Sequence, residues 1–295
     1  MTKQDIQDDQ IRIVGDNVQD NSRWKKWVVI SSICFLLIIV VFLIINYTNS
    51  TQIDDDNYIG YFEEDTILQD EAKDSIPLFN STIKDTISYI ERKDTCINDV
   101  LLRLFIPHNA KMSLHIGRIE KDSSIIFAGQ AADVRADNGE IVGAFVDKGK
   151  PISWGKSKIG YCASIDDKVY IGVAESTPLF EIATEKEGYF FRQYALVDNG
   201  QLVKNNPKGK TIRRAICQMQ DNVFMVESLT RESFHDFAQA LVDLGVNNAI
   251  YLVGTNAYGW SIDQYGIIHE HGEDIWKDNP SACPKNISYI VWKRK

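Results

Sequence analysis

The sequence predicts an α+β domain, in which antiparallel hairpins form a sheet and two or three helices pack on it, preceded by one transmembrane helix. Two observations support this fold class. From about residue 96 to the end of the 295-residue chain, short apolar and β-branched runs alternate with turns rich in Asp, Asn and Gly, which is typical of antiparallel hairpins. A single long apolar stretch lies near the N-terminus, apart from this pattern.

The apolar stretch carries no charged residue from 27 to 53, and its core at 27–45 is WVVISSICFLLIIVVFLII. A helix of about 20 apolar residues spans the hydrocarbon layer, where only the helix itself satisfies the backbone polar groups. Basic residues precede the stretch and acidic residues follow it, namely Arg23, Lys25, Lys26, Asp54, Asp55 and Asp56. Because positive charge favours the cytoplasmic side, we expect a membrane anchor from Trp27 to Tyr47, with the N-terminus in the cytoplasm and the C-terminal domain periplasmic or extracellular.

Two other N-terminal signals fit this stretch less well. A cleaved signal peptide has a shorter apolar core and a cleavage site of small residues. A lipoprotein signal needs Cys34 to end the apolar run, but the run continues through Ile45. We therefore divide the chain into a cytoplasmic tail (1–26), the anchor (27–47), an acidic stalk (48–95) and a folded domain (96–295). Helical spacing of apolar residues predicts a short amphipathic helix near the end of the stalk, at Ile76, Phe79, Ile83, Ile87 and Ile90.

The composition excludes some partners and cofactors. The net charge is −9, whereas a nucleic-acid partner requires a basic face, so we expect no nucleic acid. The five cysteines are far apart and form no CxxC pair, so a zinc ribbon is not expected; free thiols and one or two disulfides both remain compatible. His269 and His271 share one face of a predicted strand, but no third ligand is evident. We expect no metal and no cofactor.

The hairpins are predicted from paired apolar runs that flank short turns. The paired strands are 141–146 with 151–154, 159–165 with 169–174, 190–197 with 201–203, 210–219 with 223–227, and 258–262 with 267–271. Further strands are predicted at 112–119, 124–131, 248–253 and 287–292.

Two helices interrupt the strands. Thr177 is the expected N-cap of the first, with Pro178 at its first position and Gly188 beyond its end. Thr230 is the expected N-cap of the second, and Gly245 ends it. The apolar residues of this second helix share one face: Phe234, Phe237, Ala238, Leu241 and Leu244.

The segments from residue 127 onwards follow a specific order. The small-residue turn FAGQAAD (127–133) precedes a hairpin of the pattern G-x-x-x-D-x-G-K-x-I at 143–152. LVDNGQL (196–202), RRAI (213–216), a helix closing on DLG (243–245) and the strand AIYLVG (249–254) follow. This order resembles the phosphodiester glycosidase family over roughly residues 114–268. The resemblance implies the family's fold and an activity on glycosyl phosphodiesters; bacterial members are often described as exopolysaccharide-related.

Two signatures of the family are altered. The family's N-G/A-G-F-F turn corresponds here to residues 127–131, which lack the Asn. The family's L-D-G-G-G-S signature corresponds to residues 252–257, where Val253 replaces the Asp and Ala257 the Ser. The arginine of the family's R-T-A motif is present as Arg213. The resemblance therefore supports the fold better than it supports the activity.

The chemistry of a glycosyl phosphodiester selects candidate ligand-binding residues within this resemblance. A guanidinium pairs with two phosphate oxygens, so we expect Arg213 to be the principal anion contact. Its neighbour Arg214 alternates to the opposite face of the strand. Glycines let backbone N–H groups approach phosphate oxygens, which is the role expected of Gly129 and Gly254.

Asn256 and Tyr258 lie in the loop after the buried strand, where amides and aromatic rings often contact sugars, and they complete the candidate ligand-binding set. The catalytic residues stay unassigned. Departure of a leaving group through an oxocarbenium-like state requires an acid, and the family's carboxylate is absent. Asp133, Asp263 and Glu270 are alternatives among which the sequence does not choose.

These expectations combine into one functional hypothesis with one alternative. We expect a membrane-anchored protein whose extracytoplasmic domain cleaves or binds sugar-1-phosphodiesters of a cell-surface glycan, with reduced catalysis. The alternative is a non-catalytic module that binds glycans or serves as a scaffold in the cell envelope. Under the first hypothesis, the expected partners of the protein are a glycan or glycosyl phosphate and, through residues 27–47, the membrane.

Overall fold

The computed structural model describes residues 87–155, 157–205 and 207–295. These residues belong to one compact unit, Pro77–Lys295. The predicted tail, anchor and most of the stalk lie outside the described residues. Within the described ranges, no helix is long and apolar enough to cross a membrane.

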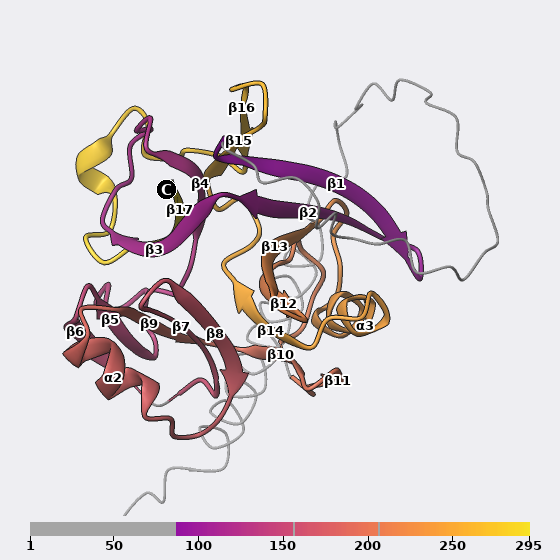
Figure 1. The fold of residues 1–295 in the computed structure, drawn as a ribbon, viewed down its shortest axis with the longest axis horizontal. Coiled ribbons are helices and arrows are strands. Elements are labelled where there is room, and N and C mark those ends of the chain that lie inside the picture. Colours follow the sequence, from indigo (N-terminus) through magenta and orange to yellow (C-terminus); the bar gives the residue numbers. More distant parts are fainter. Residues whose placement is uncertain (1–86, 156, 206) are drawn as a thin grey trace, which may run out of the picture. The chain divides into compact units, whose positions relative to one another are not determined.

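Three antiparallel sheets form the unit (Figure 1). Sheet A has seven strands in the order β1-β2-β13-β12-β14-β10-β11, with bounds β1 (Tyr89–Ile97), β2 (Val100–His108), β13 (Asn222–Ser228), β12 (Arg214–Met219), β14 (Asn248–Leu252), β10 (Ala195–Asp198) and β11 (Gln201–Leu202). Sheet B has five strands, in the order β16 (Ile268–His271), β15 (Gly259–Ile262), β4 (Ile125–Gln130), β17 (Ser288–Arg294) and β3 (Ala110–Ile116). Sheet C also has five, in the order β6 (Lys150–Trp154), β5 (Ala144–Asp147), β9 (Tyr189–Gln193), β7 (Gly160–Ile165) and β8 (Lys168–Val173).

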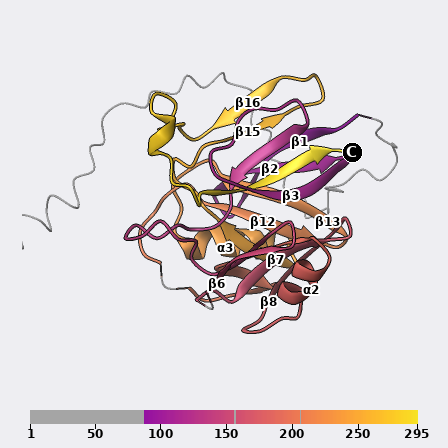
Figure 2. The same cartoon turned by 90° about the vertical axis from the view of Figure 1, so that its left-hand side faces the viewer.

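Among the described residues, two α-helices and one short 3-10 helix accompany the sheets: α2 (Leu179–Glu185), α3 (Phe234–Asp243) and η1 (Pro280–Ala282). Helix α2 contacts β5, β7 and β9 of sheet C, whereas α3 contacts β2, β10 and β11 of sheet A. Figure 2, turned by 90°, shows α2 beside sheet C and α3 beside the strands of sheet A. The predicted α+β class is therefore confirmed as antiparallel sheets with two packed α-helices.

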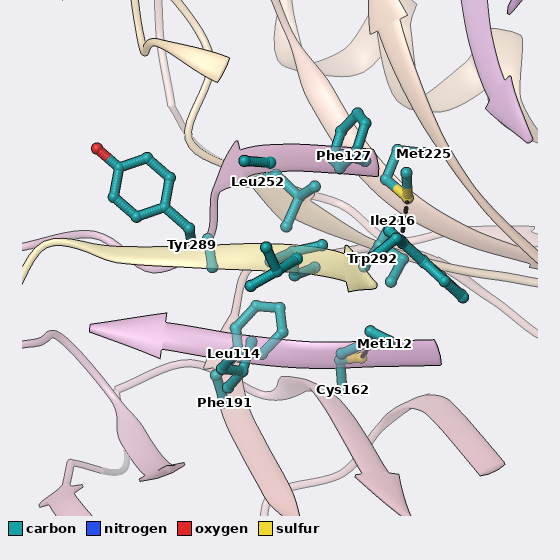
Figure 3. Packing of buried hydrophobic residues seen from close by; sticks show 14 of the residues in the cluster. Met112, Leu114, Phe127, Cys162, Phe191, Ile216, Met225, Leu252, Tyr289 and Trp292 are labelled. Atoms are coloured by element: carbon teal, nitrogen blue, oxygen red, sulfur yellow. Dashed lines mark hydrogen bonds between the residues drawn. The ribbon is translucent and has the colours of Figure 1, made fainter. Parts of the chain in front are cut away.

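Sheet A separates two hydrophobic cores, because successive residues of a strand point to opposite faces. On one face, Leu104 and Phe224 pack with Phe237 of α3. On the other face, Ile216 and Met225 pack with residues of sheets B and C. Figure 3 shows this second core, in which the indole N–H of Trp292 donates to the sulfur of Met225 at 2.9 Å.

Most of the predicted hairpins are present with shifted ends. The turn between β5 and β6 has positive φ at Lys148 (46°) and Gly149 (75°), and the turn between β7 and β8 has positive φ at Asp166 (52°) and Asp167 (64°). Asp, Asn and Gly tolerate such angles better than other residues. The predicted strand 190–197 is instead divided at Tyr194 between β9 of sheet C and β10 of sheet A.

The hairpin β1–β2 is the main element that the sequence analysis missed. Asn98 (φ 50°) and Asp99 (φ 63°) form its two-residue turn, a residue combination that favours this geometry. β1 begins at Tyr89, within the residues assigned to the stalk, and Ile90 of the predicted amphipathic helix lies in this strand, fully buried. Pairing of β1 with β2 and burial of Ile90 in the core that includes sheet B override the helical spacing.

Both helix starts differ from the prediction by a few residues. Ser233, not Thr230, is the N-cap of α3, and its Oγ accepts a hydrogen bond from the Asp236 N–H at 3.0 Å. Thr230 donates instead to the Glu232 carboxylate at 2.6 Å. Pro178 occupies the N-cap position of α2, which has no side-chain cap hydrogen bond.

Candidate functional site

Arg213 lies immediately before β12, on the face of sheet A that α3 covers. Its side chain is buried, and its guanidinium carbon is 5.1 Å from the centre of the Phe234 ring. Nε donates to the Glu232 carbonyl at 3.0 Å, and Nη2 donates to the Gly209 carbonyl at 2.8 Å. These contacts fix the guanidinium plane. No described residue accepts a hydrogen bond from Nη1, so its two N–H groups remain for a ligand, together with the second N–H of Nη2.

A row of aromatic rings extends from Arg213 to a second buried cation. The Phe234 ring lies 5.6 Å from the Tyr194 ring, in an edge-on arrangement. The Lys158 ammonium lies 3.0 Å from the centre of the Tyr194 ring, within the range of a cation–π contact. Lys158 is 3.6 Å from the Asp133 carboxylate. Two buried cations therefore flank an aromatic pair, and of the two Lys158 alone forms an ion pair with a described carboxylate.

At Gly254, the loop after β14 packs closely against Ile212, the residue before Arg213. A Cβ at this position would lie 2.2 Å from the Ile212 carbonyl oxygen, which no side chain tolerates. The Gly254 N–H donates to the Tyr251 hydroxyl at 3.3 Å, and the Tyr251 ring lies 5.1 Å from the Phe234 ring. The structure thus brings two predicted site residues, Arg213 and Gly254, into one neighbourhood.

The other predicted site residues lie in or beside sheet B. Gly129 is in β4 opposite Ile290, and a Cβ there would meet the Phe127 ring at 3.1 Å. Asn256 is exposed, and its carbonyl accepts from the Glu273 N–H at 2.9 Å. The hydroxyl of Tyr258 donates to Glu270 at 2.7 Å.

Of the three alternative carboxyl groups, Asp133 alone contacts a cation of the Arg213–Lys158 neighbourhood. Asp263 pairs with His269 at 2.8 Å. Glu270 accepts from Lys121 and Tyr258, and these hydrogen bonds, Lys121 first, lower its pKa. Both carboxylates therefore already have partners in the β15–β16 region.

Lys158 and Tyr194 are functional candidates that the sequence analysis did not identify. Neither belongs to a recognisable motif. No sequence signal identifies them: the division of the predicted 190–197 strand at Tyr194, which places this residue between two sheets, is seen only in the structure.

The described residues offer no evident metal centre. No three His, Cys, Asp or Glu side chains within the described ranges lie close enough together to hold a metal ion. The four described cysteines are free thiols, and burial raises the pKa of Cys162 and of Cys217.

Comparison with known proteins places this fold in a family. Residues 123–276 match the phosphodiester glycosidase family. The chain belongs to this family. The matched residues include β4 to β16, with the altered signatures, Arg213 and Lys158. β1, β2, β3 and β17 lie outside the match, although β2 pairs with β13 and β17 pairs with β4, so residues on both sides of the matched segment complete its sheets.

Solved structures with a similar fold include a phosphodiester glycosidase. The zebrafish N-acetylglucosamine-1-phosphodiester alpha-N-acetylglucosaminidase catalytic domain, auto-inhibited by its pro-peptide, is 16% identical, with a TM-score of 0.49, covering 72% of this chain and 86% of its own. A hypothetical protein from Synechocystis is 13% identical, with a TM-score of 0.48, covering 70% of this chain and 62% of its own. No curated protein matches the sequence.

Proposed function

We propose that this phosphodiester glycosidase relative binds a sugar-1-phosphodiester of a cell-surface glycan between Arg213 and Lys158, with at most weak hydrolysis. One observation carries the proposal: two buried cations flank the Tyr194–Phe234 pair inside the segment that matches the family. A phosphodiester is a monoanion that a guanidinium and an ammonium bind favourably. The aromatic row adds the kind of surface on which sugar rings pack.

Charge around this neighbourhood favours an anionic ligand. Lys158 contacts an aromatic ring in addition to the Asp133 carboxylate, which lies 3.6 Å away. The loop between β11 and β12 adds Lys204, Lys208 and Lys210, and its Gly209 carbonyl orients Arg213. A chain with a net charge of −9 thus concentrates basic residues here, which attracts an anion locally.

Reduced hydrolysis follows from the residues available as acids. Val253 stands where the family has a carboxylate, and a valine side chain donates no proton. Asp133 is engaged with Lys158. Loss of one acid or base group typically removes about 10²–10⁴-fold of the rate.

Calorimetric titration of the full-length chain with a methyl glycosyl phosphodiester tests the binding. Arg213→Ala should weaken it about ten- to a hundredfold, and Arg213→Lys should recover part of the affinity, since an ammonium does not form the bidentate fork. Lys158→Met, which preserves the volume near Tyr194, should also weaken it. Arg135→Ala is the matched control, because Arg135 is exposed and pairs only with Asp137. Absence of binding by the unaltered chain would favour the envelope-scaffold alternative.

We propose the anchor at residues 27–47 on sequence grounds alone. Basic residues precede the apolar stretch and acidic residues follow it, which orients the C-terminal domain outside. Protease added to intact cells should then remove the domain and spare an N-terminal tag. Digestion of the tag with protection of the domain would reverse this topology.

A further inference from the structure

A row of alternating charges crosses sheet A on the face opposite Arg213. Asp94, Arg103, Glu227 and Arg214 are successive cross-strand neighbours in β1, β2, β13 and β12. Arg103 donates two hydrogen bonds to Asp94, at 2.7 and 2.6 Å, and Nε of Arg214 donates to Glu227. The Asp94 side chain is 51% exposed and the Arg214 side chain 6%. The row therefore leads from solvent into the interior.

Three buried polar atoms beside this row have no hydrogen-bond partner: Nε of Arg92, Oγ of Ser261 and Nδ1 of His271. Arg92 is two residues from Asp94 and shares its face of β1. Ser261 and His271 share one face of the β15–β16 hairpin, because Ser261 pairs with His269 and Gly259 with His271. β1 packs against β15 and β4. Buried polar groups normally have hydrogen-bond partners. Three unpartnered atoms in adjoining strands therefore indicate that a bound group supplies their hydrogen bonds.

Aromatic contacts join the two sheets at His271. The His271 ring lies 5.6 Å from the Phe105 ring and 5.9 Å from the Phe127 ring. Phe105 is two residues from Arg103 on the same face of β2, and Phe127 pairs with Ser261 across β4 and β15. His271 thus connects the charged row of sheet A to the polar atoms of sheet B.

The carboxylates around these atoms already have partners, so not every arginine donor is used. Glu227 and Asp94 pair with Arg214 and Arg103, and Asp263 pairs with His269, while Arg92 forms no ion pair with a described residue. Burial, followed by the neighbouring Arg103, lowers the pKa of Arg92. No described residue accepts from Nη1 of Arg103 or Nη2 of Arg214. Donors from three arginines therefore surround the orphaned groups.

We propose that these facing side chains of sheets A and B bind a tetrahedral oxyanion of the phosphate class, at a site separate from the Arg213 neighbourhood. The anion site consists of Arg92, Arg103, Arg214, Ser261 and His271. Guanidinium groups match the paired oxygens of a phosphate, and the serine hydroxyl and the imidazole N–H supply further donors. Water would satisfy Ser261 and His271 but would give Arg92 no direct ion-pair partner.

Thermal unfolding and calorimetry of the full-length chain test this site with inorganic phosphate, against chloride at equal ionic strength. Phosphate should raise the melting temperature of the unaltered chain progressively with its concentration. Arg92→Gln should weaken phosphate binding by about tenfold or more, and should raise the melting temperature without phosphate because it removes an unpaired, half-buried charge. Arg135→Gln, at an exposed arginine, should change neither. His271→Gln provides a second variant if Arg92→Gln does not fold.

The outcomes separate this site from the proposed function. Arg213→Ala should keep the phosphate effect, and Arg92→Gln should keep the binding of a glycosyl phosphodiester. No phosphate effect on the unaltered chain would mean that water satisfies these groups and would overturn the inference. An equal effect on the unaltered chain and Arg92→Gln would indicate surface screening and would also overturn it. Methyl phosphate, compared with inorganic phosphate, distinguishes a phosphate group carried by a larger molecule from the free ion.

Discussion

Arg213 and Arg214 are consecutive, yet their guanidinium groups lie on opposite faces of sheet A. Arg213 packs on Phe234 at the N-terminus of α3, while Arg214 pairs with Glu227 and donates to the Ala257 carbonyl on the other face. Strand alternation alone requires this separation. Because both side chains are buried, substitution of each should produce a different defect.

Arg214→Ala should destabilise the domain far more than it affects glycosyl phosphodiester binding. Removal of one partner of a buried ion pair costs about 3–5 kcal/mol, because the remaining charge is left uncompensated. The double substitution Arg214→Met with Glu227→Leu should recover most of this loss. Urea unfolding of the single and double variants measures the coupling. A double variant as unstable as Arg214→Ala would contradict the pairing.

Gly254→Ala should destabilise by steric contact alone. The added Cβ would lie 2.2 Å from the Ile212 carbonyl oxygen, and relief of such overpacking typically costs about 1–3 kcal/mol. Gly266→Ala is a matched control, because Gly266 has φ of +79° and nothing within 4 Å of an added Cβ. The control reports backbone strain only, about 1–2 kcal/mol. Gly254→Ala should in addition weaken glycosyl phosphodiester binding, because it displaces the segment that precedes Arg213, whereas Gly266→Ala should not.

Ser233→Ala should loosen the first turn of α3. The Ser233 side chain caps the Asp236 N–H, and loss of such a cap costs about 0.5–2 kcal/mol. Hydrogen exchange at the Asp236 amide should accelerate in Ser233→Ala and stay unchanged in Thr230→Ala, since Thr230 contacts only the Glu232 side chain. Acceleration in both variants would mean that the cap extends over both residues.

Local structure is predictable from the sequence where a turn carries its own signal. Lys148-Gly149 and Asp166-Asp167 lie between apolar runs, so the hairpins β5–β6 and β7–β8 were found. Asn98-Asp99 carries an equivalent signal. The β1–β2 hairpin was not predicted because Ile87 and Ile90 continue a helical spacing. Only the burial of Ile90 of β1 in a core shared with another sheet favours a strand over a helix.

The candidate sites were less predictable because non-local pairing assembles them. Arg213 and Gly254 belong to family motifs and were identified. Lys158 and Tyr194 become neighbours only where two sheets meet. The anion site depends on cross-strand register and on the packing of β1 against β15, neither of which periodicity specifies.

Val253→Asp should increase hydrolysis if the absence of a carboxylate at residue 253 limits catalysis. The substitution restores the family's carboxylate after β14, beside the loop that carries Gly254. A positioned acid contributes about 10²–10⁴-fold, of which an unoptimised one recovers a part. A p-nitrophenyl-sugar phosphodiester gives the rate directly, and Val253→Asn is the matched control because an amide donates no ionisable proton. Rapid hydrolysis by the unaltered chain would show that another residue supplies the acid.

The stability of the domain should fall on acidification below about pH 6.5 because of His271. Burial, followed by the charges of Arg214, Arg92 and Arg103, holds its pKa well below 6.5. Above pH 6.5 the imidazole is neutral in both the folded and the unfolded chain. Below that pH only the unfolded chain takes up the proton, so the free energy of unfolding decreases by up to about 1.4 kcal/mol per pH unit.

Other charged groups of the facing strands set the size of this effect. They are Arg92 and Arg103 of β1–β2, Arg214 and Glu227 of β12–β13, and Asp263 and His269 of the region that carries His271. Glu227 is the buried carboxylate among them, and its negative charge partly offsets the effect of the arginines on the pKa of His271. Since carboxylates elsewhere also titrate as the pH falls, the informative quantity is the difference between variants rather than the absolute slope.

Urea unfolding between pH 7.5 and 5 measures this difference. His271→Gln should flatten the dependence, whereas His235→Gln should leave it unchanged, because the His235 side chain is 69% exposed. If the anion site binds as inferred, sulfate at fixed ionic strength should reduce the loss of stability in the unaltered chain, because a bound dianion favours protonation of the imidazole. Sulfate stays doubly charged over this range, so its own titration does not contribute. An equal effect of sulfate on His271→Gln would show that the anion acts elsewhere on the protein.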